Sequence, residues 1–417
     1  MLLLYNLGIR VYYLLIVIAS VYNKKARLWI SGRRCILKQI SEKVGPGSDI
    51  IWFHCSSLGE FEQGRPLMEK LKASLPDKKI LLTFFSPSGY EVRKNYPGAD
   101  YIFYLPVDTQ KNSSMFLEIV KPCMAFFIKY EFWYHYLTKL KKSGIKTYLV
   151  SGIFRPGQIF FRFYGNWFRK IFRCFTHFFL QDEESASLLK SIGLTNFTVS
   201  GDTRFDRVFS IANRAADLPV IQSFCSNKLT LVAGSIWPPD EEIIVRFINE
   251  NKFPVRFILV PHEIHEQEIR QLLDSIKVKA ARYSTISNPF PAGDSTGSSA
   301  EVLIIDVIGI LSAVYKYGKL AYIGGGFGKG IHNILEAATF GLPVIFGPNY
   351  KKFREANDLV RLKGAFPINN YSSFADILNV LLTDRKVYAE AGESAINYIR
   401  SNIGATNSIT KFVLTQS

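Results

Sequence analysis

The fold is decided by the stretch Tyr322-Ile323-Gly324-Gly325-Gly326-Phe327-Gly328-Lys329-Gly330-Ile331-His332-Asn333-Ile334-Leu335-Glu336. An apolar strand runs into five glycines, and a helix is expected to begin near His332. Glycines let a backbone approach a ligand closely, and the N–H groups at a helix start attract phosphate. Asn333 and Glu336 are three residues apart, so both face one side of that first turn, where a carboxylate can bind sugar hydroxyls. The stretch predicts a nucleotide site; the alternative is a tight turn in which Glu336 only complements the helix dipole.

Strands and helices alternate on both sides of this stretch, which is typical of parallel βαβ units. The region Arg207–Asn227 lacks a clear strand pattern and predicts a boundary between two lobes, residues 24–210 and 211–417. The segment Asn288–Ala300 is rich in proline, glycine and serine and predicts a surface loop. We therefore expect an α/β chain with two Rossmann-like lobes facing a cleft. The expected strands are Ile50–Cys55, Ile80–Phe85, Tyr101–Leu105, Met124–Ile128, Thr147–Val150 and His177–Leu180, then Leu229–Ala233, Phe257–Val260, Val302–Ile305, Leu320–Ile323 and Pro343–Phe346, and the clearest helices are Phe61–Lys72, Phe132–Lys142, Glu183–Ile192 and two within Ser373–Asn402.

Composition narrows the class of protein. A chain of 417 residues exceeds what one hydrophobic core usually serves, and a net charge of +16 suits nucleic acid, an anionic membrane or an acidic substrate. The five cysteines are scattered and form no CxxC pair, which favours a reducing compartment over a disulfide framework or a zinc module. His262-Glu263-Ile264-His265 lacks the spacing of a metal motif, so no metal is expected.

Residues 1–23 predict a membrane anchor. Met1–Tyr22 is mostly apolar and as a helix would span about 33 Å. Basic residues follow it instead of a cleavage site, which favours a retained anchor with the rest of the chain in the cytoplasm. Because Arg10 interrupts the apolar run, the helix could span the membrane or lie in its interface.

A second segment, His54-Cys55-Ser56-Ser57-Leu58-Gly59-Glu60-Phe61-Glu62, carries a candidate catalytic residue. Here a buried strand ends in a Ser/Gly loop, at the end of the strand where open α/β sheets bind ligands. Glu60 opens the next helix, where its carboxylate could take a proton from an attacking hydroxyl, as an inverting sugar transfer requires. The alternative is an ordinary first-turn glutamate. His54 is interpreted as a lone packed or surface histidine.

The stretch from Phe132 to Gln181 has no acidic residue and interleaves cations with aromatics. This composition suits anionic lipid headgroups or a phosphorylated lipid substrate, and it would also attract nucleic acid. The predicted anchor favours lipid, so no nucleic-acid partner is expected. The cations assigned to the acceptor and the membrane are Arg155, Arg162, Arg169, Lys170 and Arg173.

Together these segments resemble the 3-deoxy-D-manno-oct-2-ulosonic acid (Kdo) transferases, bacterial enzymes that add Kdo to the lipid A precursor. The resemblance covers most of the chain. It rests on Ser57-Leu58-Gly59-Glu60-Phe61, Ser86-Pro87-Ser88-Gly89, Glu131-Phe132-Trp133, Gly201-Asp202-Thr203-Arg204-Phe205-Asp206, Ala233-Gly234-Ser235 with Glu241-Glu242, and the run from His332-Asn333-Ile334-Leu335-Glu336 through Gly347-Pro348 to Phe353.

The resemblance implies a GT-B fold, CMP-Kdo as donor, a lipid A precursor as acceptor, and metal-independent, cofactor-free transfer with inversion at the bacterial inner membrane. Glu60 would be the general base on the acceptor's primary hydroxyl, and Glu131 would support the acceptor side. The residues assigned to the donor are Arg204, Ser235, Pro261, His262, Gly325, Gly326, Gly330, His332, Asn333 and Glu336.

The chain also departs from the family pattern. His262 stands where a phosphate-binding arginine is expected, and Ile310 stands where the family has a carboxylate. Two alternatives stay open: a GT-B enzyme that uses a UDP-sugar on another membrane glycolipid, and a non-catalytic, membrane-anchored nucleotide-binding protein. An NAD-dependent epimerase is disfavoured because the dinucleotide glycine fingerprint is absent.

Overall fold

The computed structural model describes residues 1–45, 47, 49–226, 228–251, 253–286 and 300–416. The chain divides into two compact units, Met1–Arg207 with Ile403–Ser417, and Val208–Asn402. The loop expected at Asn288–Ala300 lies outside the described residues, apart from Ala300 itself.

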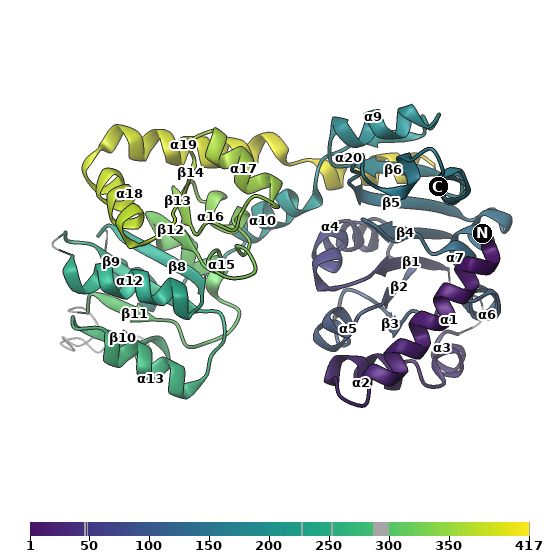
Figure 1. Cartoon of the computed structure of the whole chain (residues 1–417), viewed down its shortest axis with the longest axis horizontal. Helices are drawn as coiled ribbons and strands as arrows, with labels where there is room; N and C mark the ends of the chain where they lie inside the picture. The colour runs from purple at the N-terminus through teal and green to yellow at the C-terminus, as the bar shows by residue number, and fades with distance from the viewer. Residues whose placement is uncertain (46, 48, 227, 252, 287–299, 417) are drawn as a thin grey trace. The chain divides into compact units, whose positions relative to one another are not determined.

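The first unit contains a seven-stranded sheet in the order β3-β2-β1-β4-β5-β6-β7, with parallel pairing between neighbours (Figure 1). All six residues of β1 are buried, since helices pack on both faces of a doubly wound sheet. The order reverses between β1 and β4, which creates a switch point at the carboxyl ends of these strands. The strands are β1 Ile50–Cys55, β2 Lys79–Phe84, β3 Tyr101–Tyr104, β4 Met124–Ile128, β5 Lys146–Gly152, β6 His177–Leu180 and β7 Phe197–Val199.

Helices cover this sheet, and its two faces carry separate hydrophobic clusters. One cluster includes Ile409 and Val413 of the C-terminal helix α20, which packs beside α4. The sequence analysis assigned residues 403–417 to the second lobe, whereas the structure groups them with the first unit. The helices are α1 Leu2–Ala19, α2 Lys24–Ser31, α3 Ile36–Lys43, α4 Leu58–Ser74, α5 Pro87–Arg93, α6 Gln110–Val120, α7 Tyr134–Lys142, η1 Ile159–Phe161, α8 Asn166–Phe172, α9 Glu183–Ser191, α10 Thr203–Asn213 (which continues into the second unit) and α20 Ala405–Thr415.

The second unit repeats the plan with a seven-stranded parallel sheet in the order β10-β11-β9-β8-β12-β13-β14. Its order reverses between β8 and β12, so its switch point lies at the ends of those two strands. The strands are β8 Thr230–Ile236, β9 Arg256–Pro261, β10 Ala280–Arg282, β11 Val302–Ile304, β12 Leu320–Ile323, β13 Val344–Phe346 and β14 Ala365–Pro367. The helices are α11 Pro219–Cys225, α12 Pro238–Glu250, α13 Glu266–Ser275, η2 Tyr283–Thr285, α15 Leu311–Val314, η3 Tyr315–Tyr317, α16 Leu335–Ala338, α17 Arg354–Arg361, α18 Tyr371–Thr383 and α19 Arg385–Asn402.

The helix after the glycines differs from the prediction. It was expected to begin near His332, but α16 begins at Leu335 and has only four residues. The segment before it is not helical, and the backbone N–H of His332 donates back to the carbonyl of Gly324 at 3.1 Å. A long helix start that could bind phosphate is therefore not present after this loop.

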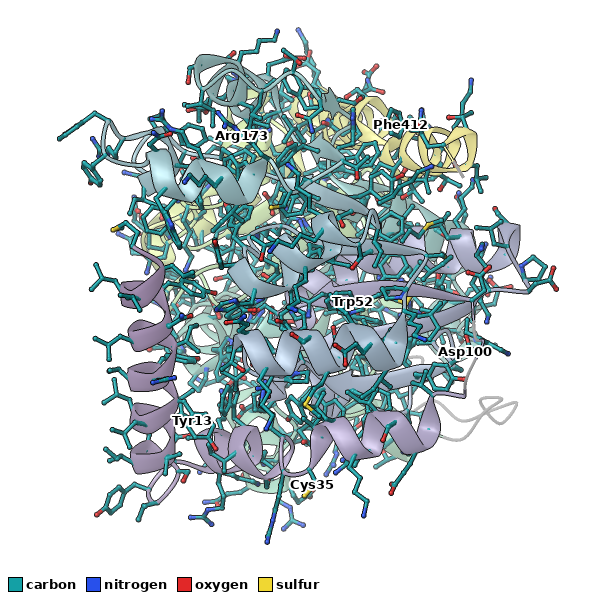
Figure 2. The ribbon with its side chains drawn as sticks, turned by 90° about the vertical axis from the view of Figure 1, so that its right-hand side faces the viewer. Tyr13, Cys35, Trp52, Asp100, Arg173 and Phe412 are labelled. Carbon is teal, nitrogen blue, oxygen red and sulfur yellow. The ribbon has the colours of Figure 1, made fainter. Side chains whose placement is uncertain are left out.

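Helix α1 lies along one side of the first unit, and its outer side chains project away from it (Figure 2). On the inner side, the Tyr5 hydroxyl donates to Asp108 at 2.6 Å, and Asn6 Oδ1 lies 2.7 Å from His135 Nε2. The Tyr12 ring packs near Trp29, with 6.2 Å between the ring centroids. Helix α1 is long enough and apolar enough to cross a membrane, judged by length and composition alone.

Candidate active site

The two predicted catalytic glutamates follow neighbouring strands at the switch point of the first sheet. Glu60 lies two residues into α4, after β1, and Glu131 lies three residues beyond the end of β4. The negative charge of both carboxylates disfavours ionisation of the buried thiol of Cys55, the last residue of β1. Burial first, then Glu60 and Glu131, hold the pKa of this thiol well above its usual value. The structure thus brings both glutamates to one edge of the sheet.

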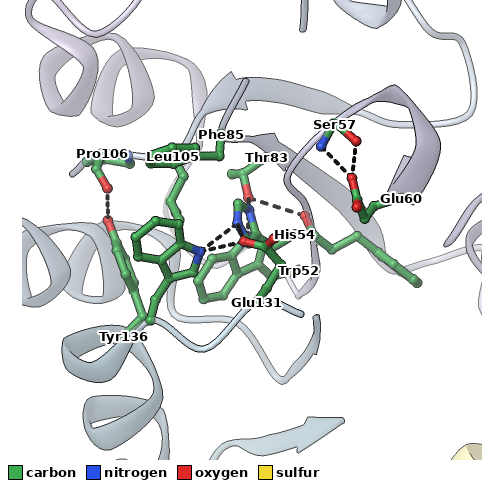
Figure 3. Close-up of polar contacts among 12 residues, drawn as sticks. Trp52, His54, Ser57, Glu60, Thr83, Phe85, Leu105, Pro106, Glu131 and Tyr136 are labelled. Atoms are coloured by element: carbon green, nitrogen blue, oxygen red, sulfur yellow. Dashed lines mark hydrogen bonds and ion pairs between the residues drawn. The ribbon is translucent and has the colours of Figure 1, made fainter. Parts of the chain in front are cut away.

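Glu60 also has a structural role. Its Oε2 accepts the backbone N–H of Ser57 at 2.9 Å and the Ser57 hydroxyl, which completes a capping box at the start of α4 (Figure 3). The alternative interpretation, that Glu60 serves the first turn of its helix, is therefore confirmed as a structural role. It does not exclude catalysis, because a carboxylate has about four acceptor positions and this cap occupies two on one oxygen.

Glu131 is buried within a hydrogen-bonded network. The Trp133 indole donates to Glu131 Oε2 at 2.7 Å, and His54 Nε2 lies 3.1 Å from the same oxygen (Figure 3). His54 Nδ1 lies 2.9 Å from the Thr83 hydroxyl, which accepts the Trp52 indole N–H at 2.8 Å. Buried polar groups need such partners, so the network fixes the orientation of the carboxylate.

The protons of this network can be placed in two ways. When the Thr83 hydroxyl donates to His54 Nδ1, the imidazole proton lies on Nε2 and is donated to Glu131. When the hydroxyl donates to the Phe53 carbonyl at 3.3 Å, the proton lies on Nδ1, and Nε2 accepts the Trp133 indole N–H at 3.1 Å. In both arrangements Trp133 donates to Glu131 Oε2, and the other carboxylate oxygen has no hydrogen-bond partner among the residues that the structure describes.

His54 is the residue that sequence reasoning missed in this unit. It was interpreted as a packed or surface histidine, and it is fully buried. Its partner Glu131 lies 77 residues away, so no local pattern links them. The available signal was a titratable side chain in an otherwise apolar buried strand, which must find a hydrogen-bond partner.

Nine of the ten residues assigned to the donor lie in the second unit, at the ends of β8, β9 and β12. Asp240 ties these ends together, although sequence reasoning did not single it out. Its buried carboxylate accepts the Tyr322 hydroxyl at 2.7 Å, the Gly325 N–H at 2.9 Å and the Trp237 N–H at 3.0 Å. Burial raises the pKa of Asp240, and these three donors oppose that effect.

The glycines are required by the protein's own packing. A Cβ on Gly324 would lie 2.2 Å from the Ser235 carbonyl oxygen, and one on Gly326 would lie 2.6 Å from the Gly347 backbone. Gly325 and Gly330 have φ values of +87° and +135°, which favour glycine. The prediction that the glycines serve ligand approach is therefore incomplete, because two of them allow backbones of neighbouring loops to touch.

Asn333 and Glu336 are brought together as predicted. The Asn333 amide donates to Glu336 Oε1 at 2.9 Å, and the Ser312 hydroxyl donates to Oε2 at 2.6 Å. Each oxygen keeps acceptor capacity for a hydroxyl of a bound ligand. Ser235 adopts a left-handed φ of +53° at the end of β8, close to Gly324.

Three rings are stacked beside the glycine loop. The ring centroids of His262 and His332 are 4.3 Å apart, and those of Trp237 and His262 are 4.5 Å apart. The Trp237 indole donates to His332 Nε2 at 3.0 Å, so the proton of this neutral imidazole lies on Nδ1. Burial, then His262, lowers the pKa of His332 to about 4. His262 follows Pro261, which pairs with Ile236 at the end of β8.

The remaining predicted residues lie in the first unit. Arg204, in α10, forms an ion pair with Asp202 at 2.8 Å. It belongs to the first unit, whereas the other residues assigned to the donor belong to the second. Arg169 donates to the carbonyls of Phe160 and Arg162, at 2.9 and 2.8 Å, and so serves the loop between β5 and α8. The other predicted membrane cations, Arg155, Arg162, Lys170 and Arg173, are exposed.

Within the described ranges, no group of three histidine, cysteine, aspartate or glutamate side chains is placed to hold a metal ion. In the segment between β9 and α13, His265 Nε2 lies 3.4 Å from a carboxylate oxygen of Glu263, and both side chains are exposed.

Comparisons with known proteins relate the chain to a family of sugar transferases. The family model for 3-deoxy-D-manno-octulosonic-acid transferase (kdotransferase) matches residues 30–207. The 3-deoxy-D-manno-octulosonic acid transferase of Chlamydia muridarum is 27% identical over 87% of this chain and 85% of its own, and that of Aquifex aeolicus is 28% identical over 81% and 87%.

A solved structure shares the architecture. UDP-GlcNAc 2-epimerase from Neisseria meningitidis, bound to UDP-GlcNAc, is 13% identical and matches 88% of this chain and 100% of its own with a TM-score of 0.61. This likeness concerns the fold alone, and the predicted GT-B architecture of two Rossmann-like units is confirmed. The chain is therefore similar to the 3-deoxy-D-manno-octulosonic acid transferases over most of its length, and it is a glycosyltransferase.

Proposed function

We propose that this chain transfers Kdo from CMP-Kdo to the primary hydroxyl of a lipid A precursor, with inversion at the anomeric carbon. The match to the transferase family model and the similarity to curated Kdo transferases support the choice of Kdo as the transferred sugar. The observation that carries the mechanism is the pair of glutamates at the β1–β4 switch point, since each follows the carboxyl end of one of these two paired strands. Inverting transfer needs one base on the acceptor hydroxyl, and this edge supplies carboxylates for that task.

The proposed roles of the two glutamates differ because their surroundings differ. Glu60 is half-buried and is held by its cap, so it takes the proton from the acceptor hydroxyl. The hydroxyl oxygen bonds to the anomeric carbon as the bond from that carbon to the phosphate oxygen breaks, and CMP leaves with the electron pair. Glu131, fixed by Trp133 and His54, accepts a hydrogen bond from the acceptor and orients it.

The second unit would bind the nucleotide. Glu336, already positioned by Asn333 and Ser312, would accept ribose hydroxyls. The Nδ1–H of His332 would donate to an oxygen of the donor, because Trp237 holds the other ring nitrogen. His262, which stacks on His332, stands where the family pattern has a phosphate-binding arginine. In this proposal the donor phosphate is therefore bound by N–H donors more than by an ion pair.

We also propose that the protein works at the cytoplasmic face of the inner membrane. The outer side of α1 exposes Leu3, Leu7, Leu14 and Ile18, each by more than half. Because its inner side is bonded to Asp108 and His135, the helix suits an in-plane anchor better than a span. The basic stretch adjoins α1: the rings of Tyr5 and Trp167 are 6.1 Å apart, and Phe163 and Tyr164 are exposed nearby in sequence.

The decisive experiment is a transfer assay with purified protein in EDTA. CMP-Kdo is generated in situ, and a tetra-acylated disaccharide bisphosphate is offered as acceptor. A product heavier by one or more Kdo residues would support the donor, the acceptor and metal independence together. No product, with folded protein and intact donor, would reject the proposal and favour a UDP-sugar, which a screen of nucleotide sugars would then identify.

The membrane assignment has a separate test. Binding to vesicles containing phosphatidylglycerol should exceed binding to phosphatidylcholine vesicles at low salt and should weaken as salt rises. Equal binding to both vesicle types at low salt would contradict a role for the basic stretch.

A further inference from the structure

A cavity of about 720 Å³ lies in the first unit between α1, α2, α3 and the segment before α6. Its volume is in the range of sites that bind small molecules. Apolar side chains dominate the lining, including Ile9 and Tyr13 of α1, Ile36 and Leu37 of α3, and Val107. None of the described residues that line it is acidic. The cavity is separate from the residues assigned above to catalysis and to the donor.

Cations line the same cavity, and their environments differ. Arg33 and Arg27 already form hydrogen bonds with the protein backbone. Arg33 donates to the carbonyls of Leu105 and Phe85, at 2.9 and 2.6 Å. Arg27 donates to the carbonyl of Val21, just beyond the end of α1. Arg10 and Arg34 are exposed, and the guanidinium group of neither has a hydrogen bond or an ion pair with any residue that the structure describes.

The position of Arg10 is informative. Its helix is mostly apolar, and a cation within such a segment costs free energy in lipid and usually has a function. Arg10 lines this cavity and also a second hollow, of about 680 Å³, beside α6. It therefore lies on the flank of α1, between the apolar outer side and the body of the unit. The anionic headgroup of a lipid at the height of Arg10 could therefore contact the guanidinium while the acyl chains of that lipid lie along the helix.

The cavity is connected to the candidate active site by packed rings. Arg33 stacks on Trp29, 3.9 Å from the ring centroid, and Trp29 contacts Phe85 with 5.6 Å between ring centroids. Phe85 packs on Trp133 at 4.7 Å, and Trp133 donates to Glu131. One wall of the cavity is thus joined through these rings to the carboxylate assigned to the acceptor side.

We propose that this cavity binds an acylated, phosphorylated amphiphile from the membrane, with an acyl chain against Ile9, Ile36 and Leu37 and a phosphate at Arg10 and Arg34. Apolar lining without carboxylates selects a chain, and two unpaired guanidinium groups select a phosphate. The amphiphile has two possible sources, a bulk anionic phospholipid or the glycolipid acceptor. The second source rests on the proposed function, whereas the site itself does not.

The test uses phosphatidylglycerol with a photoreactive group in one acyl chain, added to the full chain in neutral detergent without donor. Cross-linked peptides are mapped by mass spectrometry. Cross-links are expected in α1 and α3, and the phosphatidylcholine analogue should label them about tenfold less. The double variant Arg10→Gln with Arg34→Gln should lose labelling by a similar factor. The control, Lys121→Gln with Lys190→Gln, removes the same charge outside the cavity and should label normally.

A second variant keeps the charges and fills the space. Leu37→Trp should reduce labelling in both helices while leaving the thermal unfolding midpoint within a few degrees. Competition by the tetra-acylated disaccharide bisphosphate would identify the acceptor as the occupant, and absence of competition would identify a bulk phospholipid. Labelling that is equal for both phospholipids, or unchanged in both the double variant and Leu37→Trp, would overturn the proposal. No outcome depends on turnover, so a failed transfer assay would not be confused with a failure of this site.

Discussion

Replacing Glu60 by glutamine separates its structural role from its proposed chemistry. In the structure Glu60 Oε2 accepts the Ser57 N–H at 2.9 Å and completes the capping box of α4. Glutamine at this position also completes a capping box, because its amide oxygen accepts the same N–H. A helix cap contributes about 1 kcal/mol, so Glu60→Gln should cost less than this, a shift in unfolding midpoint below about 4 °C.

The effect on transfer should be much larger. An amide cannot take a proton from the acceptor hydroxyl, and loss of a general base lowers turnover by about 10²–10⁴-fold. The assay is initial-rate transfer of Kdo at saturating acceptor, with unfolding of the same preparation followed by circular dichroism. CMP binding, measured by calorimetry, should be unchanged because the nucleotide residues lie elsewhere in the chain.

Ser57→Ala is the matched control. It removes the hydroxyl that serves the cap and keeps the carboxylate, so stability should fall by about 1 kcal/mol while turnover stays within about tenfold. Turnover of Glu60→Gln within about threefold of the native chain would refute the reasoning. So would an equal loss of turnover in Ser57→Ala, because the cap and not the base would then be responsible.

Three further predictions concern other parts of the chain. Asp108→Ala should lower the free energy of unfolding in urea by about 3 kcal/mol or more, because the Tyr5 hydroxyl and two backbone N–H groups of α7 lose their buried acceptor; a loss below about 1 kcal/mol would contradict this. Burial and a neighbouring histidine lower the pKa of His332 to about 4, so its ring is neutral from pH 6 to 8. Trp237→Phe removes the N–H that donates to this ring, so the His332 titration midpoint measured by NMR should rise and the KM for the donor should increase about 3–10-fold. An unchanged midpoint would exclude the contact between the indole and the imidazole. Burial and neighbouring carboxylates raise the pKa of Glu241 from 4.5 to about 7, so ionisation destabilises the fold as pH rises through that interval; Glu241→Gln should melt higher than the native chain at pH 8 but not at pH 4.5, and a shift of equal size at both would argue against titration.

Much of the fold could be predicted from the sequence because its strands are buried on both faces. β4, β6 and β12 begin and end at the predicted residues, since each is a largely apolar run. β7, β10 and β14 were not predicted, because each has only three residues and the apolar run is interrupted by Thr198, Arg282 or Pro367. β11 and β13 are equally short but wholly apolar, and they were predicted. The C-terminal segment was assigned to the second lobe because chain order alone cannot show that α20 returns to the first unit.

The candidate site was less accessible to sequence reasoning. Glu60 could be named from its place after β1, whereas Glu131 on its own was interpreted as complementing a helix dipole and was assigned to the site only through the family resemblance. The partners that hold the site lie far away in sequence: His54 is 77 residues from Glu131, and Asp240 is 85 residues from Gly325. Such pairs depend on which strands become neighbours, and strand order is a tertiary property that no local pattern determines.

The return of α20 to the first unit has a consequence for biosynthesis. Ile409 and Val413 complete a hydrophobic cluster with residues of β1, β2 and β4, so this unit cannot close while the ribosome is still making the second one. The second unit, by contrast, is continuous in sequence and can fold before α20 leaves the ribosome. The nascent first unit therefore waits with an apolar surface uncovered, and a fragment ending near Arg207 would keep that surface exposed and be prone to aggregate.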